Sequence, residues 1–152
     1  MARTITQEDA SGCGIACVAF VCRTSYGFAK RRYFKGLGSP ARGYFCRDLV
    51  KALGRAGKRY GYRHIKGRER LKPGTIIFIK RSERYPAGHY LVKTGNGYMN
   101  PWINFPDIRN PKSAFARRLP GIPSYAVYPV NRPGLSYKSQ QNRKSACCSR
   151  AN

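Results

Sequence analysis

The sequence has few acidic residues and no apolar run long enough to cross a membrane. Only 6 of its 152 residues are Asp or Glu, against 30 Lys and Arg, so the formal net charge is +24. The longest apolar stretch, Cys13 to Cys22, is about half of the roughly 20 residues that a membrane-spanning helix needs. It follows Glu8 and Asp9 instead of a basic segment. We therefore expect no signal peptide and no membrane anchor.

Histidine is also scarce, which limits metal binding. The only histidines are His64 and His89, and the six cysteines stand at positions 13, 17, 22, 46, 147 and 148. A structural zinc ion needs four ligands, and Cys13 and Cys17, one helical turn apart, have poor geometry for a bridge to each other. We expect mostly free thiols in a reducing compartment, with no metal and no cofactor. A zinc site and a disulfide framework are the less favoured alternatives.

Length and composition predict one compact domain followed by a basic tail. The chain is 41% hydrophobic and 12% aromatic, which supplies enough apolar material for a core. Beyond Asn131 it is rich in Ser, Gln, Lys and Arg, so we expect a domain over 1–130 and a flexible tail over 131–152. The tail has five basic residues and no acidic one, so 19 of the 24 net positive charges belong to the domain.

The order of the predicted elements is typical of an α+β fold. Apolar residues from Cys13 onward predict a buried helix that ends near Gly27, and a second helix is predicted over about 44–55. Strand patterns follow over 60–64, 75–79, 89–93, 98–102 and 124–130. Gly95-Asn-Gly97 indicates a hairpin turn. We therefore expect N-terminal helices packed on an antiparallel sheet.

Cys13 is a candidate nucleophile because it stands at the predicted start of a helix. There the free backbone N–H groups and the positive end of the helix dipole stabilise a thiolate. A single buried cysteine is more often a small core residue than a nucleophile. Catalysis therefore needs partners elsewhere in the chain.

Residues of the right chemical type for each partner are present. His89 follows Gly88 and opens an apolar strand, so its ring would be held firmly enough to act as a general base. Asn100 lies across the predicted hairpin and would orient that ring. The backbone N–H of Cys13 and the side-chain amide of Gln7 are candidate donors to the oxyanion formed on attack.

These motifs resemble a known family. Gln7-Glu-Asp-Ala-Ser-Gly-Cys13-Gly-Ile-Ala-Cys17 is similar to the opening motif of papain-like cysteine peptidases of the bacteriocin-processing, double-glycine-leader type. Leu71-Lys-Pro-Gly74, Gly88-His-Tyr-Leu-Val92 and Asn100-Pro101 follow in that family's order and at similar spacing. The resemblance covers about residues 5–130 and implies a papain-like fold. It also implies that Cys13 is the nucleophile, His89 the general base, Asn100 the orienting residue and Gln7 the oxyanion donor.

The chain departs from that family's pattern at two positions. The family commonly has Asp-Pro where this chain has Asn100-Pro101, and often an acidic residue where this chain has Gly12. An amide still orients a histidine ring but stabilises its protonated form less than a carboxylate does. No Gly-Gly pair is present in the chain.

Other residues have competing interpretations. His64 is a second candidate base, and Asn104 a second candidate for orienting His89. Cys17 is expected in the core, Cys22 and Cys46 as core or half-exposed thiols, and Cys147 and Cys148 in the tail. Trp102 and Tyr98 are expected in the core or in a cleft wall.

Basic residues interleaved with aromatic ones suggest contact with nucleic acid, since cations bind phosphates and rings stack on bases. The candidates occur in two clusters: Lys30, Arg31, Arg32 and Lys35, then Lys58, Arg59 and Arg63. The high charge predicts attraction to polyanions but carries no information on the fold.

The sequence as a whole predicts a monomeric cysteine peptidase that hydrolyses peptide or protein substrates through a thioester. Its basic surface would bind DNA, RNA or acidic substrates, and action in virus or phage maturation would unite the two features. The expected location is cytoplasmic or virion-associated. The main alternative is a non-enzymatic nucleic-acid-binding protein with the same fold. A third is a related acyl transfer, such as deamidation or removal of a ubiquitin-like modifier.

Overall fold

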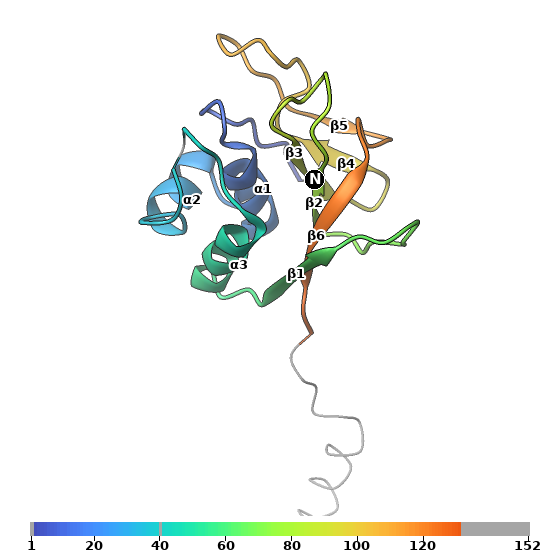
Figure 1. The fold of residues 1–152 in the computed structure, drawn as a ribbon. Coiled ribbons are helices and arrows are strands. Elements are labelled where there is room, and N and C mark those ends of the chain that lie inside the picture. Colours follow the sequence, from blue (N-terminus) through green and yellow to red (C-terminus); the bar gives the residue numbers. More distant parts are fainter. Residues whose placement is uncertain (1, 40, 132–152) are drawn as a thin grey trace, which may run out of the picture.

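Three N-terminal helices pack against a six-stranded antiparallel sheet (Figure 1). The structure is a computed structural model, and it describes residues 2–39 and 41–131. The helices are α1 (Cys13–Cys22), α2 (Tyr26–Arg32) and α3 (Cys46–Arg55). The strands are β1 (Tyr60–His64), β2 (Ile76–Ile79), β3 (His89–Lys93), β4 (Tyr98–Asn100), β5 (Ala114–Ala116) and β6 (Pro123–Pro129). The predicted α+β arrangement is confirmed.

The last strand lies inside the sheet. The strand order is β1-β6-β2-β3-β4-β5, and every neighbouring pair is antiparallel. The chain after β5 therefore returns to pair between β1 and β2. This leaves β1 and β5 as the two edges and places β3, which begins with His89, away from both.

Both faces of the sheet are covered, so there are two apolar clusters. Ile76 pairs with Val92 and points to the helices, whereas the next pair, Ile77 and Leu91, points to the other face. All four side chains are fully buried. Burial on both faces explains why this part of the sequence is apolar without alternation.

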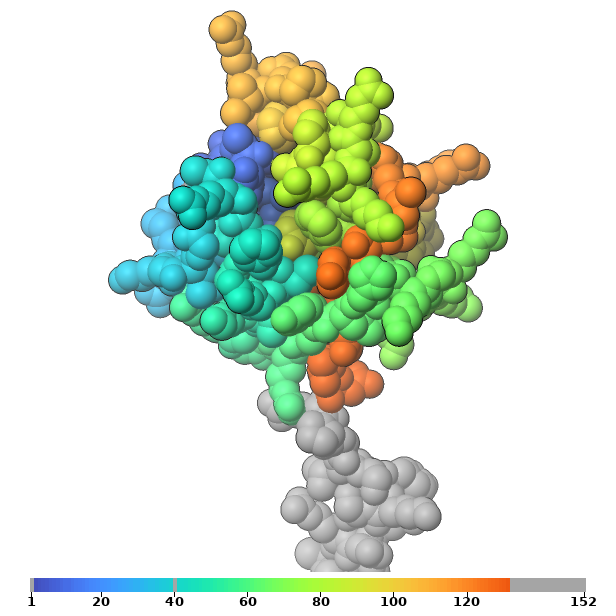
Figure 2. Space-filling view, in the orientation of Figure 1, coloured from blue at the N-terminus to red at the C-terminus, as the bar shows by residue number. Residues whose placement is uncertain are grey.

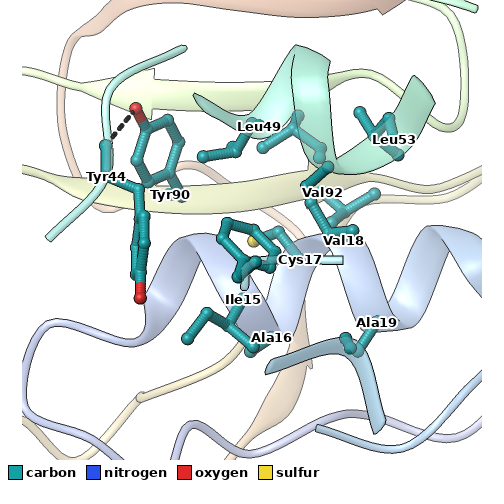
Figure 3. Packing of buried hydrophobic residues seen from close by; sticks show 14 of the residues in the cluster. Ile15, Ala16, Cys17, Val18, Ala19, Tyr44, Leu49, Leu53, Tyr90 and Val92 are labelled. Atoms are coloured by element: carbon teal, nitrogen blue, oxygen red, sulfur yellow. Dashed lines mark hydrogen bonds between the residues drawn. The ribbon is translucent and has the colours of Figure 1, made fainter. Parts of the chain in front are cut away.

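Helix α1 is apolar on all sides because other elements surround it. It contacts α2, α3 and β3, and every residue from Gly14 to Ala19 is buried. Figure 3 shows α1 beneath Leu49 and Leu53 of α3 and Val92 of β3. This packing fixes the start of α1, and therefore Cys13, against the sheet.

One prediction about the helices needs correction, and α2 was not predicted. α1 ends at Cys22 and not near Gly27, because Arg23 takes the left-handed conformation (φ 54°) and its N–H bonds to the helix's last carbonyls. Gly27 lies inside α2, which begins after Ser25, whose hydroxyl accepts a hydrogen bond from the N–H of Phe28 at 3.1 Å. The second predicted helix and the five predicted strands are confirmed to within about two residues at each end.

Other expectations have mixed outcomes. β5, which has three residues, was not predicted. The predicted tail falls, except for Asn131, outside the residues that the structure describes. Within the described residues, no helix has both the length and the apolar character needed to cross a membrane.

The left-handed cap of α1 gives a stability prediction. A side chain at such a position is strained and glycine is not, so Arg23→Gly should raise the free energy of unfolding by about 0.5–1 kcal/mol. Urea denaturation of both proteins measures this, and Arg23→Ala, which keeps the Cβ atom, should bring no comparable gain. An Arg23→Gly protein no more stable than the parent would contradict the prediction.

Candidate active site

Cys13 and His89 are the first residues of two elements that pack together. Cys13 begins α1, His89 begins β3, and the Cys13 sulfur lies against the backbone N–H of Tyr90. The hydroxyl of Tyr90 donates to the carbonyl of Tyr44 at 2.9 Å, which ties β3 to the segment that precedes α3 (Figure 3). The thiol is therefore held beside the residue that follows the candidate base.

Asn100 fixes the orientation of the His89 ring. Its Oδ1 accepts a hydrogen bond from the backbone N–H of Trp102 at 3.0 Å and lies 2.8 Å from Nε2 of His89. A backbone N–H can only donate, so the atom facing His89 is the amide oxygen. Nε2 must therefore carry the proton in this bond. The other ring nitrogen, Nδ1, is the one left to act as a base.

Tyr85 completes this arrangement, and sequence reasoning missed it. Its hydroxyl accepts from Nδ2 of Asn100 at 3.2 Å and donates to the carbonyl of Trp102 at 3.0 Å. Its ring stacks on the ring of His89, with centroids 4.3 Å apart and planes 3° apart. The stacking covers one face of the imidazole. A single tyrosine in a loop carries no pattern by which the sequence could have identified it.

Burial opposes charge on both candidate catalytic groups. Burial raises the pKa of the Cys13 thiol, although the N–H groups of Tyr90, Gly14 and Cys13 itself act in the opposite direction. Burial also lowers the pKa of His89 to about 4, with the Asn100 hydrogen bond raising it and the nearby Arg84 lowering it further. At neutral pH the pair is therefore a thiol and a neutral imidazole. Burial thus acts against the thiolate that the sequence predicts at the helix N-terminus, and the backbone N–H groups act for it.

Within the described residues, no hydrogen bond joins the Cys13 sulfur to His89. Cys13 is half-buried, and His89 is only 3% exposed. Figure 2 shows the surface hollowed between the segment that leads into α3 (cyan) and the loop before β3 (yellow-green), with the N-terminal part of the chain (blue) at the bottom.

Gln7 lies beside the site, but its amide is already engaged. Its backbone N–H donates to the carbonyl of Pro101 at 3.3 Å, next to Asn100. Its Nε2 donates to the carbonyls of Asp9 at 2.9 Å and Ala10 at 3.2 Å, and its buried Oε1 has no hydrogen-bond partner among the described residues. An oxyanion role for Gln7 requires that one of the two carbonyls be released.

The competing residues lie elsewhere. His64 is exposed on β1, where its ring meets the ring of Tyr125 edge to face, with the ring centroids 5.2 Å apart. Asn104 holds its own loop, because Oδ1 accepts from the N–H of Lys112 at 2.7 Å and Nδ2 donates to the carbonyl of Asn110 at 2.9 Å. Neither residue replaces His89 or Asn100 at the site.

The described cysteines are all free thiols. Cys17 is fully buried in the core as expected, and Cys22 and Cys46 are half-buried. Cys147 and Cys148 lie outside the described residues. Between residues 2 and 131, apart from the undescribed residue 40, the structure has no group of three or more cysteine, histidine or acidic side chains that could hold a metal ion.

The predicted nucleic-acid-binding residues do not all remain available to a ligand. Lys30 on α2 bonds to the carboxylate of Asp9 at 2.9 Å, and Arg63 on β1 bonds to Glu69 at 2.9 Å. Other members lie on exposed parts of α2, after α2 and in the connection between α3 and β1: Arg31, Arg32, Lys35, Lys58 and Arg59. Two of the seven cations are therefore partly neutralised within the protein.

Comparison with models of known protein families found no match, and comparison with curated proteins found none either. The geometry itself brings together a cysteine at a helix start, a buried neutral histidine and an amide that selects the tautomer of that histidine. Such a set can move one proton between a sulfur and a bound substrate.

The low pKa of His89 predicts a loss of stability in mild acid. An unfolded histidine has a pKa near 6.5, so between about pH 6.5 and 4 the unfolded chain binds the proton that the folded protein excludes. The free energy of unfolding should therefore fall by up to about 3 kcal/mol as the pH falls through this window. Urea denaturation at several pH values measures it.

The matched control for this prediction is His64, the only other histidine. His89→Asn should remove most of the pH dependence in this window, and His64→Asn should leave it intact. An equal dependence in the parent protein and in His89→Asn would show that other groups cause it.

Proposed function

We propose that the protein is a cysteine peptidase in which Cys13 is the nucleophile and His89 the general base. The observation that carries the proposal is the hydrogen bond of 2.8 Å between Nε2 of His89 and Oδ1 of Asn100. It leaves Nδ1 unprotonated at the start of the strand that contacts α1. In the proposal this nitrogen accepts the proton of the Cys13 thiol, whose sulfur lies against the backbone N–H of Tyr90, the residue after His89.

The proposed reaction begins from the neutral pair. As the Cys13 sulfur attacks the carbonyl carbon of a peptide bond, its proton passes to Nδ1 of His89. Asn100 accepts a hydrogen bond from Nε2 throughout and keeps the protonated ring in place. The negative charge that develops on the carbonyl oxygen would be stabilised by free N–H groups in the first turn of α1.

The second half of the reaction returns the proton. Nδ1 donates the proton to the amide nitrogen as the C–N bond breaks. The amine product departs, and the acyl part of the substrate stays on Cys13 as a thioester. Water then attacks the thioester, with Nδ1 accepting its proton, and the carboxylic acid is released as Cys13 regains its hydrogen. No cofactor takes part in these steps.

The arrangement of the elements supports a papain-like assignment. The nucleophile begins a buried helix, and the base and the orienting residue lie on adjacent antiparallel strands, β3 and β4. The motif resemblance at Gln7, Cys13, His89 and Asn100 supports the same assignment. Virus or phage maturation remains our proposed setting, because a peptidase with a net charge of +24 suits protein substrates associated with nucleic acid.

One observation favours the alternative of a non-enzymatic binding protein. Both N–H groups of the Gln7 amide are held by carbonyls, and the catalytic thiol makes no hydrogen bond to His89 in the described chain. Catalytic hydrogen bonds are often long in ligand-free enzymes and shorten when substrate binds. Activity measurements therefore decide between the two functions.

Cleavage of a peptide library tests the proposed activity. The parent protein should cleave a subset of the library, and Cys13→Ala should not, because it lacks the sulfur that is proposed to attack the peptide bond. Cys46→Ala is the matched control and should cleave like the parent. Cys46 is also a half-buried thiol, but its sulfur lies 3.6 Å from the hydroxyl of Tyr90 and has no proposed role in catalysis. Mass spectrometry of the products gives both the activity and the scissile sequence. Equal cleavage by Cys13→Ala, or no cleavage of any peptide by the parent, would contradict the proposal.

Removing the groups that position His89 should lower the rate without changing substrate affinity. Asn100→Ala should reduce kcat by about 10²-fold, because the protonated ring loses its acceptor and its fixed orientation. Tyr85→Phe keeps the stacked ring but removes the hydroxyl, so a smaller decrease is expected. KM should stay within about twofold in both variants. A rise in KM at constant kcat would mean that these residues only shape the substrate site.

A further inference from the structure

A basic hollow lies on the face of the sheet opposite the helices. Three segments form it: the loop that connects β1 to β2, the turn between β3 and β4, and the chain that leads into β6. Its volume is about 570 Å³, within the range of sites for small ligands. In Figure 2 the green loop and the orange segment stand on either side of it.

The charges at the rim of the hollow are almost all positive. Arg68 and Arg70 are exposed in the loop after β1 and line the hollow. Glu69, between them in the sequence, is held by β1 and its own loop. Its carboxylate accepts hydrogen bonds from the guanidinium of Arg63 at 2.9 Å and from the backbone N–H of Lys66 at 3.1 Å. The only acidic residue that lines the hollow is thereby neutralised. The same contacts hold the loop so that the two arginines stand on either side of Glu69.

The floor of the hollow is apolar and aromatic. Ile65 belongs to the apolar cluster on this face of the sheet, and Leu71 and Tyr98 pack against it. The ammonium group of Lys93 lies 4.9 Å from the centre of the Tyr98 ring and donates to the carbonyl of Thr94 at 2.9 Å. A ligand thus meets flat apolar surface at the bottom and cations around it.

We propose that this hollow binds a segment of single-stranded nucleic acid. Bases would lie on Tyr98 and the neighbouring apolar side chains, and Arg68 and Arg70 would contact the phosphates. Single strands expose bases that can stack on such a surface, and they present phosphates at regular intervals to a cationic rim. An acidic peptide matches the cations but not the aromatic floor, and in a duplex the bases are covered by stacking.

This site is separate from the candidate peptidase site. Its lining contains none of the residues Gln7, Cys13, His89 and Asn100. It also differs from the two basic clusters singled out in the sequence, of which Arg63 acts here only by holding Glu69. Binding of nucleic acid should therefore be the same in the parent protein and in Cys13→Ala.

Fluorescence anisotropy with a labelled oligothymidine of about 12 nucleotides tests the proposal on the full chain. The test variant is Arg68→Gln with Arg70→Gln. Its control is Arg47→Gln with Lys51→Gln, which removes the same charge from exposed positions on α3, outside both basic clusters. The test variant should bind about tenfold more weakly at moderate salt, and the slope of log K against log salt should fall by about 1.4, since each phosphate contact on a single strand contributes about 0.7. The control should bind within about twofold of the parent.

A third variant, Tyr98→Leu, tests the floor while keeping its apolar packing. It should weaken binding by about fivefold with no change in the salt slope, because a stacking surface is lost and no charge is. Circular dichroism confirms that each variant folds. Equal losses in the test and control pairs would overturn the proposal by showing that the affinity is spread over the whole basic surface. Displacement by a polyglutamate peptide of equal charge, as complete as by unlabelled oligothymidine, would assign the site to acidic peptides instead.

Discussion

The hydrogen bond between His89 and Asn100 is the interaction on which the candidate site depends. It exists because β3 and β4 form a tight hairpin, which places the start of one strand beside the end of the other. The backbone N–H of Trp102 donates to the same Oδ1 that faces His89, and Nδ2 of Asn100 donates to the hydroxyl of Tyr85, so the amide has a single satisfied orientation. The tautomer of His89 follows from this orientation, and the tautomer decides which ring nitrogen can accept a proton.

Burial imposes a second constraint, which acts on charge. The packing that holds α1 against β3 also shields Cys13 in part and His89 almost completely from water, which favours the uncharged form of both groups. A site of this kind does not keep a reactive thiolate in the absence of substrate. In the proposed reaction, proton transfer is therefore coupled to attack, and the first turn of α1 stabilises charge only as it forms. In our proposals the surface charge of the protein has no part in this chemistry and serves instead to attract nucleic acid or acidic substrates.

The sequence predicted those parts of the fold that local patterns determine. Apolar periodicity gave α3 and β1, and the hairpin signal at Gly95 to Gly97 placed Asn100 near His89, which the structure confirms. The end of α1 was missed because Arg23 adopts a conformation that normally requires glycine. Tyr85 and the engaged amide of Gln7 were missed for another reason: their contacts come from loops whose paths no local pattern encodes. The basic hollow likewise arises only when three separate segments meet.

The central claim is that a thioester forms on Cys13, and trapping this intermediate tests it most directly. A peptide that the protein cleaves is mixed with excess protein, the reaction is quenched in acid within the first turnover, and the digested protein is analysed by mass spectrometry. The account predicts an acyl group on the peptide that contains Cys13, present in the parent protein and removed by hydroxylamine. Cleavage of the peptide with no acyl group on Cys13 at any time, or with the acyl group on another residue, would contradict it.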